Sequence, residues 1–228
     1  MWAAVPLLIA AFAASCGGGG DAVTEEQARA LLPRMVLQPE DVPEGLEQAG
    51  EQFTTNEQLA GPGIGVRPGI EKIEEWGRIL GYERDFQAAG VGGSGPPVIG
   101  VNTAASFYET PEGASASFAE VAQQARDTDW AQFYTDLTEF QVREVDRDVP
   151  ADEILWLRLS GQRPSTTGDG LLLLVDDQIV FRVGQVRAFL RVLISQEDAT
   201  DRDLALERTE ALLQTQIQHI RDTLESME

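Results

Sequence analysis

The sequence predicts a single α+β domain: a mainly antiparallel sheet flanked by helices, with a long C-terminal helix. Three observations predict this fold class. The second half of the chain alternates apolar and polar residues in short runs separated by turn residues, which is typical of antiparallel strands. Helical patterns with capping signals come before, between and after these runs. The 228 residues, 43% of them hydrophobic, suffice for one domain with a core.

The first half mixes helix starts with strands. Thr24-Glu25-Glu26-Gln27 is a capping box and predicts a helix that ends near Arg34. Thr110 before Pro111 predicts another helix start, and apolar spacing predicts a helix over 68–80. A short helix with a buried aromatic stripe is expected from the spacing of Trp130, Phe133, Tyr134 and Leu137. Strands are expected at Leu46–Thr55, Tyr82–Ala88 and Val98–Tyr108.

The second half is predicted to be a series of strands followed by one helix. Asp176-Asp177-Gln178 is interpreted as a turn between two of the strands. Val183-Gly184-Gln185-Val186 predicts a two-residue hairpin. The closing helix is expected over about 201–224, with one apolar seam. The predicted strands are Glu139–Val145, Ile154–Leu159, Leu171–Val175, Ile179–Val183 and Val186–Ile194.

The N-terminus resembles a bacterial lipoprotein signal. The apolar run Ala3–Ala14 has the length of a signal-peptide core and is too short to span a bilayer. Small residues follow it, then Cys16 and a glycine run. The resemblance implies that Cys16 carries lipid after residues 1–15 are removed, that 16–23 form a glycine-rich tether, and that 24–228 form the domain. It places the protein on the extracytoplasmic side of the cell membrane.

Two alternatives to the lipoprotein signal remain. A plain secretory signal would be cleaved at the Ala11-Phe12-Ala13 box and would leave Cys16 as a free thiol. A buried core helix would also contain such an apolar run.

Charge excludes several kinds of partner. With 17 basic against 38 acidic residues, the formal net charge is −21, which is unsuitable for binding nucleic acid. High net charge favours a soluble monomer. One cysteine and one histidine exclude a disulfide scaffold and Cys/His zinc sites.

No motif in the chain predicts catalysis or a cofactor. Gly90–Gly95 matches the dinucleotide pattern by letters, but a strand pattern follows it where a helix is needed. His219 is interpreted as a half-exposed helix residue, and no residue is assigned a catalytic role. Two acidic clusters lack calcium-loop spacing and are interpreted as solvated loops, with no metal expected. They comprise Asp146, Asp148, Asp152 and Glu153, and Asp198, Asp201 and Asp203.

Strand alternation suggests a candidate binding face. Along 186–194, apolar residues alternate with arginine and phenylalanine. If the runs 154–159, 179–183 and 186–194 are neighbours, their second face would carry Trp156, Arg158, Arg182, Arg187, Phe189 and Arg191. Such a face would suit an anionic or amphipathic ligand. Alternatively, a helix covers the face and acidic residues pair the arginines, or the arginines are simply exposed to solvent.

Several further motifs resemble those of bacterial surface lipoproteins. They include Leu37–Gly45, Trp76–Tyr82, Tyr108–Ala114, Pro150–Glu153 and Val180–Gly184. The order of elements is similar to that of extracellular PknH-type sensor domains and PsbP/Mog1-like lipoproteins. The resemblance implies an antiparallel sheet flanked by helices and no catalytic residue.

Together these observations predict a lipid-anchored, non-catalytic module that binds a small ligand or an envelope protein, or senses it. Two alternatives are an envelope assembly factor that works by protein contact and a hydrolase built from scattered carboxylates. A pair of carboxylates with raised pKa in a cleft would favour the hydrolase.

Overall fold

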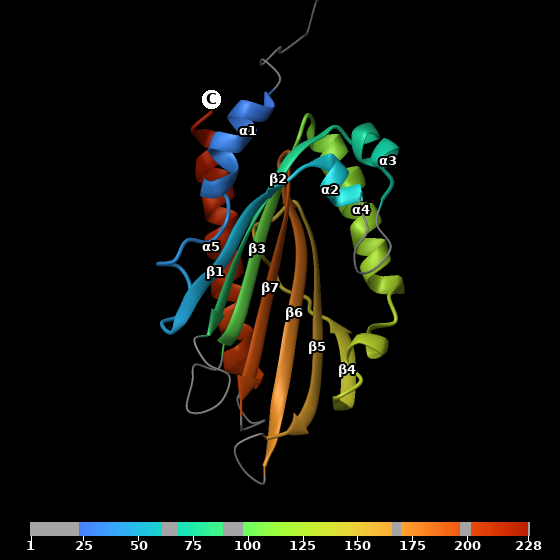
Figure 1. Cartoon of the computed structure of the whole chain (residues 1–228), viewed down its shortest axis with the longest axis vertical. Coiled ribbons are helices and arrows are strands. Elements are labelled where there is room, and N and C mark those ends of the chain that lie inside the picture. Colours follow the sequence, from blue (N-terminus) through green and yellow to red (C-terminus); the bar gives the residue numbers. More distant parts are fainter. Residues whose placement is uncertain (1–22, 61–67, 89–97, 166–169, 197–201, 228) are drawn as a thin grey trace, which may run out of the picture.

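A computed structural model describes residues 23–60, 68–88, 98–165, 170–196 and 202–227. Its centre is one seven-stranded antiparallel sheet in the order β1-β2-β3-β7-β6-β5-β4 (Figure 1). The strands are β1 (Leu46–Thr54), β2 (Arg78–Ala88), β3 (Val98–Tyr108), β4 (Thr138–Glu144), β5 (Glu153–Pro164), β6 (Leu171–Val183) and β7 (Val186–Gln196). The helices are α1 (Glu25–Leu31), η1 (Leu32–Arg34), α2 (Asn56–Ala60), α3 (Ile70–Glu75), α4 (Pro111–Asp127), η2 (Trp130–Phe133) and α5 (Arg202–Glu225).

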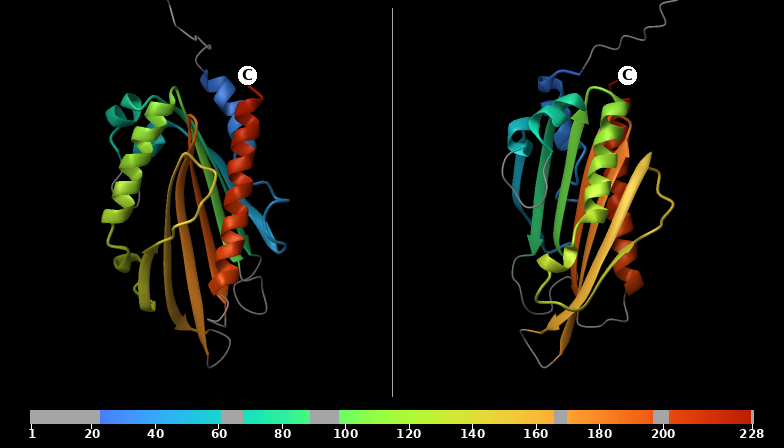
Figure 2. Two further views of the ribbon diagram at one scale, coloured as in Figure 1. Left: turned by 180° about the vertical axis from the view of Figure 1, so that it is seen from behind. Right: turned by 90° about the vertical axis from the view of Figure 1, so that its right-hand side faces the viewer.

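Helices cover both faces of the sheet. α1, η1 and α5 pack on one face, and α2, α3, α4 and η2 lie on the other (Figure 2). The predicted α+β class, with an antiparallel sheet, flanking helices and a long C-terminal helix, is therefore confirmed. Of the helices in the described ranges, none is long and apolar enough to cross a bilayer.

The main core lies between the sheet and α5. On β7 the predicted apolar face is buried at every alternate position from Val186 to Ile194. The seam of α5 meets it through Leu206, Leu213, Ile217 and Ile220, all buried. The hairpin between β6 and β7 turns at Gly184, whose φ of +56° favours glycine. Sequence periodicity therefore identified this layer correctly.

The chain around the start of the segment Leu37–Gly45 is held by contacts with β2 and α5. Arg84 on β2 donates to the Leu37 carbonyl at 2.9 Å and pairs with Glu51 at 3.1 Å. The Nδ1 atom of His219 lies 3.2 Å from the Val36 carbonyl, so this histidine serves packing between α5 and the entry segment. The Leu37–Gly45 motif thus attaches the start of the domain to its sheet.

The helix expected over 68–80 is shorter than predicted. α3 ends at Glu75, and Gly77 adopts a φ of +65°, which terminates the helix. Residues from Arg78 onward then enter β2. Likewise, the expected helix at 130–137 is limited to the short η2, and Phe133 within it is 47% exposed.

The turn expected at Asp176–Gln178 is absent, because β6 continues through it. Asp176 and Asp177 point to opposite faces of the strand, and both are buried. Each carboxylate is paired with an arginine, Asp176 with Arg191 and Asp177 with Arg158. These pairs offset the cost of placing two adjacent acids inside a sheet.

Asp177 is the centre of a buried polar network. It accepts hydrogen bonds from Trp156 Nε1 at 2.9 Å, Arg158 Nε at 2.7 Å and Thr209 Oγ1 at 2.8 Å. Thr209 belongs to α5, so the network joins the helix to β5 and β6. The side chains of Arg158 and Asp177 are 3% and 0% exposed.

We expect Asp177→Asn to destabilise the fold by about 3–5 kcal/mol, because it removes the charge of one partner from a buried ion pair. Urea unfolding measures the loss. Glu25→Gln is the matched control, since it removes a carboxylate from an exposed i,i+4 pair with Arg29 and should cost about 0.5 kcal/mol or less. Equal stability of the two variants would contradict the central role of Asp177.

Candidate functional site

The six residues predicted to share a binding face lie on two different faces. Trp156 and Arg158 pair with Ile179 and Asp177, and they lie on the α5 side. The other four, Arg182, Arg187, Phe189 and Arg191, lie on the α4 side. The interpretation of one shared face is therefore wrong.

The error has a physical reason. Leu155, Leu157 and Leu159 on β5 are buried against α4 in a second apolar cluster, rather than against α5. Both faces of the sheet are covered, so an apolar set does not by itself identify which face a strand residue occupies.

Neighbouring groups hold Arg182 and Phe189 in place on the α4 side. Arg182 donates to Asp152 at 3.0 Å and also binds Glu153, as expected if acidic residues pair the arginines. Phe189 packs at the edge of the apolar cluster under α4. The acidic cluster at 146–153 thus supplies two ion-pair partners.

Arg187 has no carboxylate partner among the described residues. It donates to Ser117 Oγ at 2.8 Å and lies 5.9 Å from the centre of the Tyr108 ring. The neighbouring Arg78 is 5% exposed and bonds only uncharged oxygens of Thr54, Asn56 and Ser106. Burial, with the nearby charge of Arg187, lowers the pKa of the Arg78 guanidinium to about 10.

Arg191 anchors the segment after α4 to the sheet. Its guanidinium donates to Asp176 at 2.6 and 2.9 Å, and the hydroxyl of Tyr134 donates to the same carboxylate. Burial and the Asp176 charge raise the pKa of the Tyr134 hydroxyl. The Tyr134 ring stacks on Phe140 of β4 at 5.2 Å between centroids. Asp176 therefore joins η2, β4 and β7.

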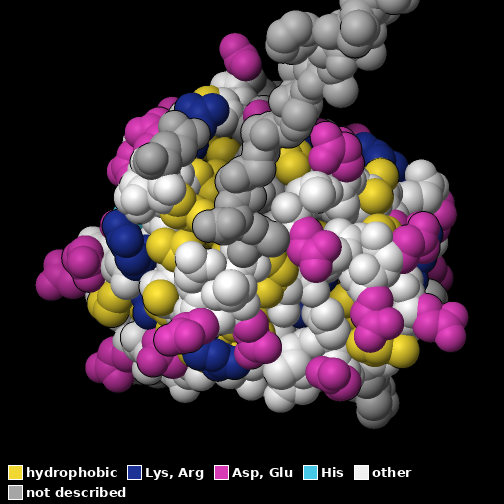
Figure 3. Space-filling model, turned by 90° about the horizontal axis from the view of Figure 1, so that it is seen from above, with side chains coloured by type: hydrophobic (Ala, Val, Ile, Leu, Met, Phe, Trp, Pro, Cys, Tyr) yellow, Lys and Arg dark blue, Asp and Glu magenta, His cyan; other side chains and the backbone are white. Residues whose placement is uncertain are grey.

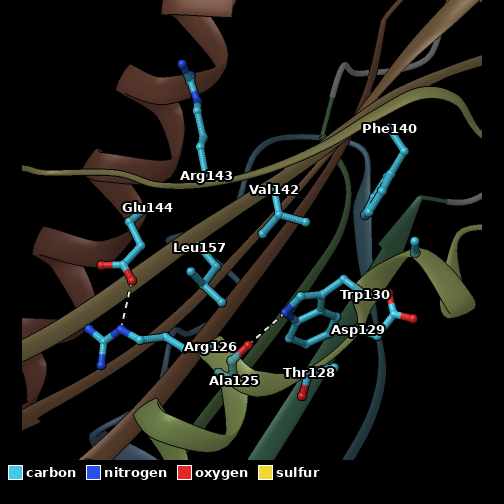
Figure 4. A pocket seen from close by; sticks show the side chains of 11 residues that line it. Ala125, Arg126, Thr128, Asp129, Trp130, Phe140, Val142, Arg143, Glu144 and Leu157 are labelled. Atoms are coloured by element: carbon cyan, nitrogen blue, oxygen red, sulfur yellow. Dashed lines mark hydrogen bonds and ion pairs between the residues drawn. The ribbon is translucent and has the colours of Figure 1, made fainter.

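Beside this anchor is a pocket of about 490 Å³. The end of α4 and η2 form one wall, β4 forms the other, and Leu157 of β5 lies at the base. Trp130, Val142 and Leu157 surround the same space, whereas Arg143 extends away from it (Figure 4). The volume lies within the range of about 300–1,000 Å³ typical of ligand sites.

The polar groups of the pocket are mostly engaged with each other. Arg126 donates to Glu144 at 2.7 Å across the pocket, and Trp130 Nε1 donates to the Ala125 carbonyl at 2.9 Å. Thr128 Oγ1 donates to the Gln124 carbonyl at 2.7 Å. The lining thus combines apolar surface with the Arg126–Glu144 salt bridge and the charged residues Asp129 and Arg143.

The sequence contained the aromatic residues of this site, but their role was missed. The spacing of Trp130, Phe133 and Tyr134 was interpreted as a buried stripe, whereas only Trp130 and Tyr134 pack partly against the core. Thr128 and Asp129 interrupt the helical pattern immediately before these aromatic residues. This interruption is the sequence signal that the segment from Trp130 onward leaves the core.

The remaining sequence candidates do not form a site in the described residues. The glycine motif at 90–95, Asp198, Asp201 and the side chain of Asp203 lie outside them. In the ranges described, no three His, Cys, Asp or Glu residues are grouped as a metal site.

Comparison with known proteins finds similarity among solved structures. No protein-family model matches the chain, and no curated protein sequence matches it. The structure is similar to the crystal structure of the extracellular domain of PknH from Mycobacterium tuberculosis, with a TM-score of 0.49 and 12% identity. The similarity covers 87% of this chain and 98% of that one.

We expect Tyr134→Phe to destabilise the protein by about 2 kcal/mol, because it removes a hydrogen bond to a buried carboxylate and keeps the ring on Phe140. Backbone hydrogen exchange should rise at 130–134. Tyr82→Phe removes a hydroxyl bound to Glu51 on the opposite half of the sheet and should leave exchange at 130–134 unchanged. Unchanged exchange in both variants would exclude Tyr134 as the anchor.

Proposed function

We propose that this protein is an extracytoplasmic binding module, anchored to the cell membrane through lipid on Cys16. Its binding site is the pocket between η2 and β4, and the pocket is the observation that carries the proposal. The site takes a ligand with an apolar part that packs on Trp130, Val142 and Leu157. Apolar side chains next to polar and charged groups, here Asp129 and the Arg126–Glu144 pair, are typical of the lining of binding pockets.

Two features of the chain support anchoring at the end opposite the pocket. The apolar run and Cys16 precede the domain in sequence, and the described chain begins beside α1. Figures 1 and 2 place α1 at one end of the molecule, with η2 and β4 towards the other. Anchoring through Cys16 would therefore leave the pocket open to the surroundings.

The charge of the α1 end fits this orientation. Seen from that end, acidic side chains outnumber basic ones around the rim (Figure 3). Acidic groups are repelled by anionic lipid headgroups. The glycine-rich tether, residues 16–23, would then separate the domain from the bilayer.

A second candidate function is protein contact in the envelope. Phe133 and Val142 beside the pocket are 47% and 43% exposed. Exposed apolar side chains are typical of an interaction surface when they gather in one patch.

Native mass spectrometry of the mature domain, purified gently from its own cells, tests the pocket. We expect an added mass that is lost on denaturation and in Trp130→Ala, because the indole forms one wall. Phe53→Ala, which removes an aromatic ring from the opposite edge strand β1, should retain the added mass. A bare mass, or one insensitive to Trp130→Ala, would overturn the pocket as the site.

Membrane fractionation with Cys16→Ser tests the anchor. We expect the wild type in the membrane fraction with acyl chains on its N-terminal residue, and the variant to lose both. Ser15→Ala keeps a small residue before the cysteine and should remain acylated. An unmodified Cys16 thiol would instead indicate plain secretion.

A further inference from the structure

We infer that the pocket receives an extended, positively charged segment of another protein, which adds to β4 as a further strand and seats an apolar side chain beside Trp130. The inference rests on the proposed function, because it requires the pocket to be a binding site.

β4 presents a free edge. It is the last strand in the sheet order and pairs only with β5. Val145 N–H donates to the Trp156 carbonyl at 2.9 Å, so the backbone N–H of Val145 points towards β5. Because this direction alternates from residue to residue in antiparallel pairs, the backbone groups of Val142 and Glu144 point outward. Those two residues therefore offer donors and acceptors to an added strand.

The same two residues lie at the pocket. Val142 and Glu144 pair with Leu159 and Leu157, so their side chains lie on the α4 face. A strand added to β4 would lie about 4.8 Å away, with alternate side chains on that face. A residue opposite Val142 would thus carry its side chain on the face where Val142 and Trp130 line the pocket, and the Trp130 ring centre is 6.3 Å from that of the exposed Phe133.

Charge complementarity favours a basic occupant. The segment from Asp127 to Asp148 contains seven acidic and two basic residues, and Glu144 is paired with Arg126. A second copy of this chain would bring a further charge of −21 to the contact, which opposes self-association. Lysine or arginine flanking the apolar side chain would complement these carboxylates.

The opposite edge of the sheet, strand β1, does not combine an edge strand with exposed large hydrophobic residues. Strand β1 is also terminal, but none of the exposed large hydrophobic residues of the described chain lies on it. The free edge of β4 is short, because Glu139 has a φ of +52° and the register shifts between Thr138 and Gln141. Binding is therefore expected at one edge, over residues 141–144.

Fluorescence anisotropy with a labelled synthetic peptide tests the inference. The peptide alternates lysine with valine and carries one central phenylalanine. We expect saturable binding to the mature domain that weakens about tenfold or more in Val142→Lys. Ala49→Lys adds the same charge to an exposed position on β1 and should bind as the wild type does. A peptide with N-methylated amides should also bind about tenfold more weakly, because it cannot pair with β4.

The outcomes separate this inference from the proposed function. If neither Val142→Lys nor N-methylation of the peptide weakens its affinity, binding reflects general attraction to an acidic surface, and the inference is overturned. An added mass lost in Trp130→Ala, without peptide binding, would overturn the inference and leave the pocket as a small-ligand site. Failure of both experiments would overturn both proposals.

Discussion

Two adjacent carboxylates in the middle of β6 hold the layers of the domain together. Asp177 faces α5 and accepts hydrogen bonds from Trp156, Arg158 and Thr209. Asp176 faces the other layer and binds Arg191 and Tyr134. Buried charges are costly unless they are paired and hydrogen-bonded. The dipeptide Asp176-Asp177 therefore links the continuous strand β6 to α5 on one face and to the segment after α4 on the other.

The pocket follows from how the α4 layer ends. α4 packs on β5, β6 and β7 through Phe118 and Ala122 and stops at Asp127, where its last turn contacts the outer strand β4 through the Arg126–Glu144 pair. The chain then turns through Thr128 and Asp129 into η2, which Tyr134 fixes to Asp176. The pocket lies between this segment and β4.

Sequence periodicity predicted most of the fold, because elements such as β7 and α5 have one face that is more buried than the other. The alternation of β7 and the seam of α5 are examples, and both were correct. The sequence could not show which face of the sheet each β5 residue occupies, since the leucines of β5 are buried on the α4 face rather than on the α5 face. It also could not show that Asp176 and Asp177 are strand residues, because their arginine partners are distant in the chain. The pocket was missed for a similar reason, because its walls come from two separate segments, 125–131 and 140–144. Neither segment by itself has a pattern that indicates a binding site.

The two ends of the described chain lie together, since α1 begins beside the end of α5 (Figure 1). A pulling force transmitted through the N-terminal segment would enter at α1 and η1, which pack on β2 and β3. The pocket lies at the other edge of the sheet, on β4 and β5. Tension that peels α1 from the sheet would therefore leave the pocket walls in place, so mechanical load and ligand occupancy act on separate parts of the domain.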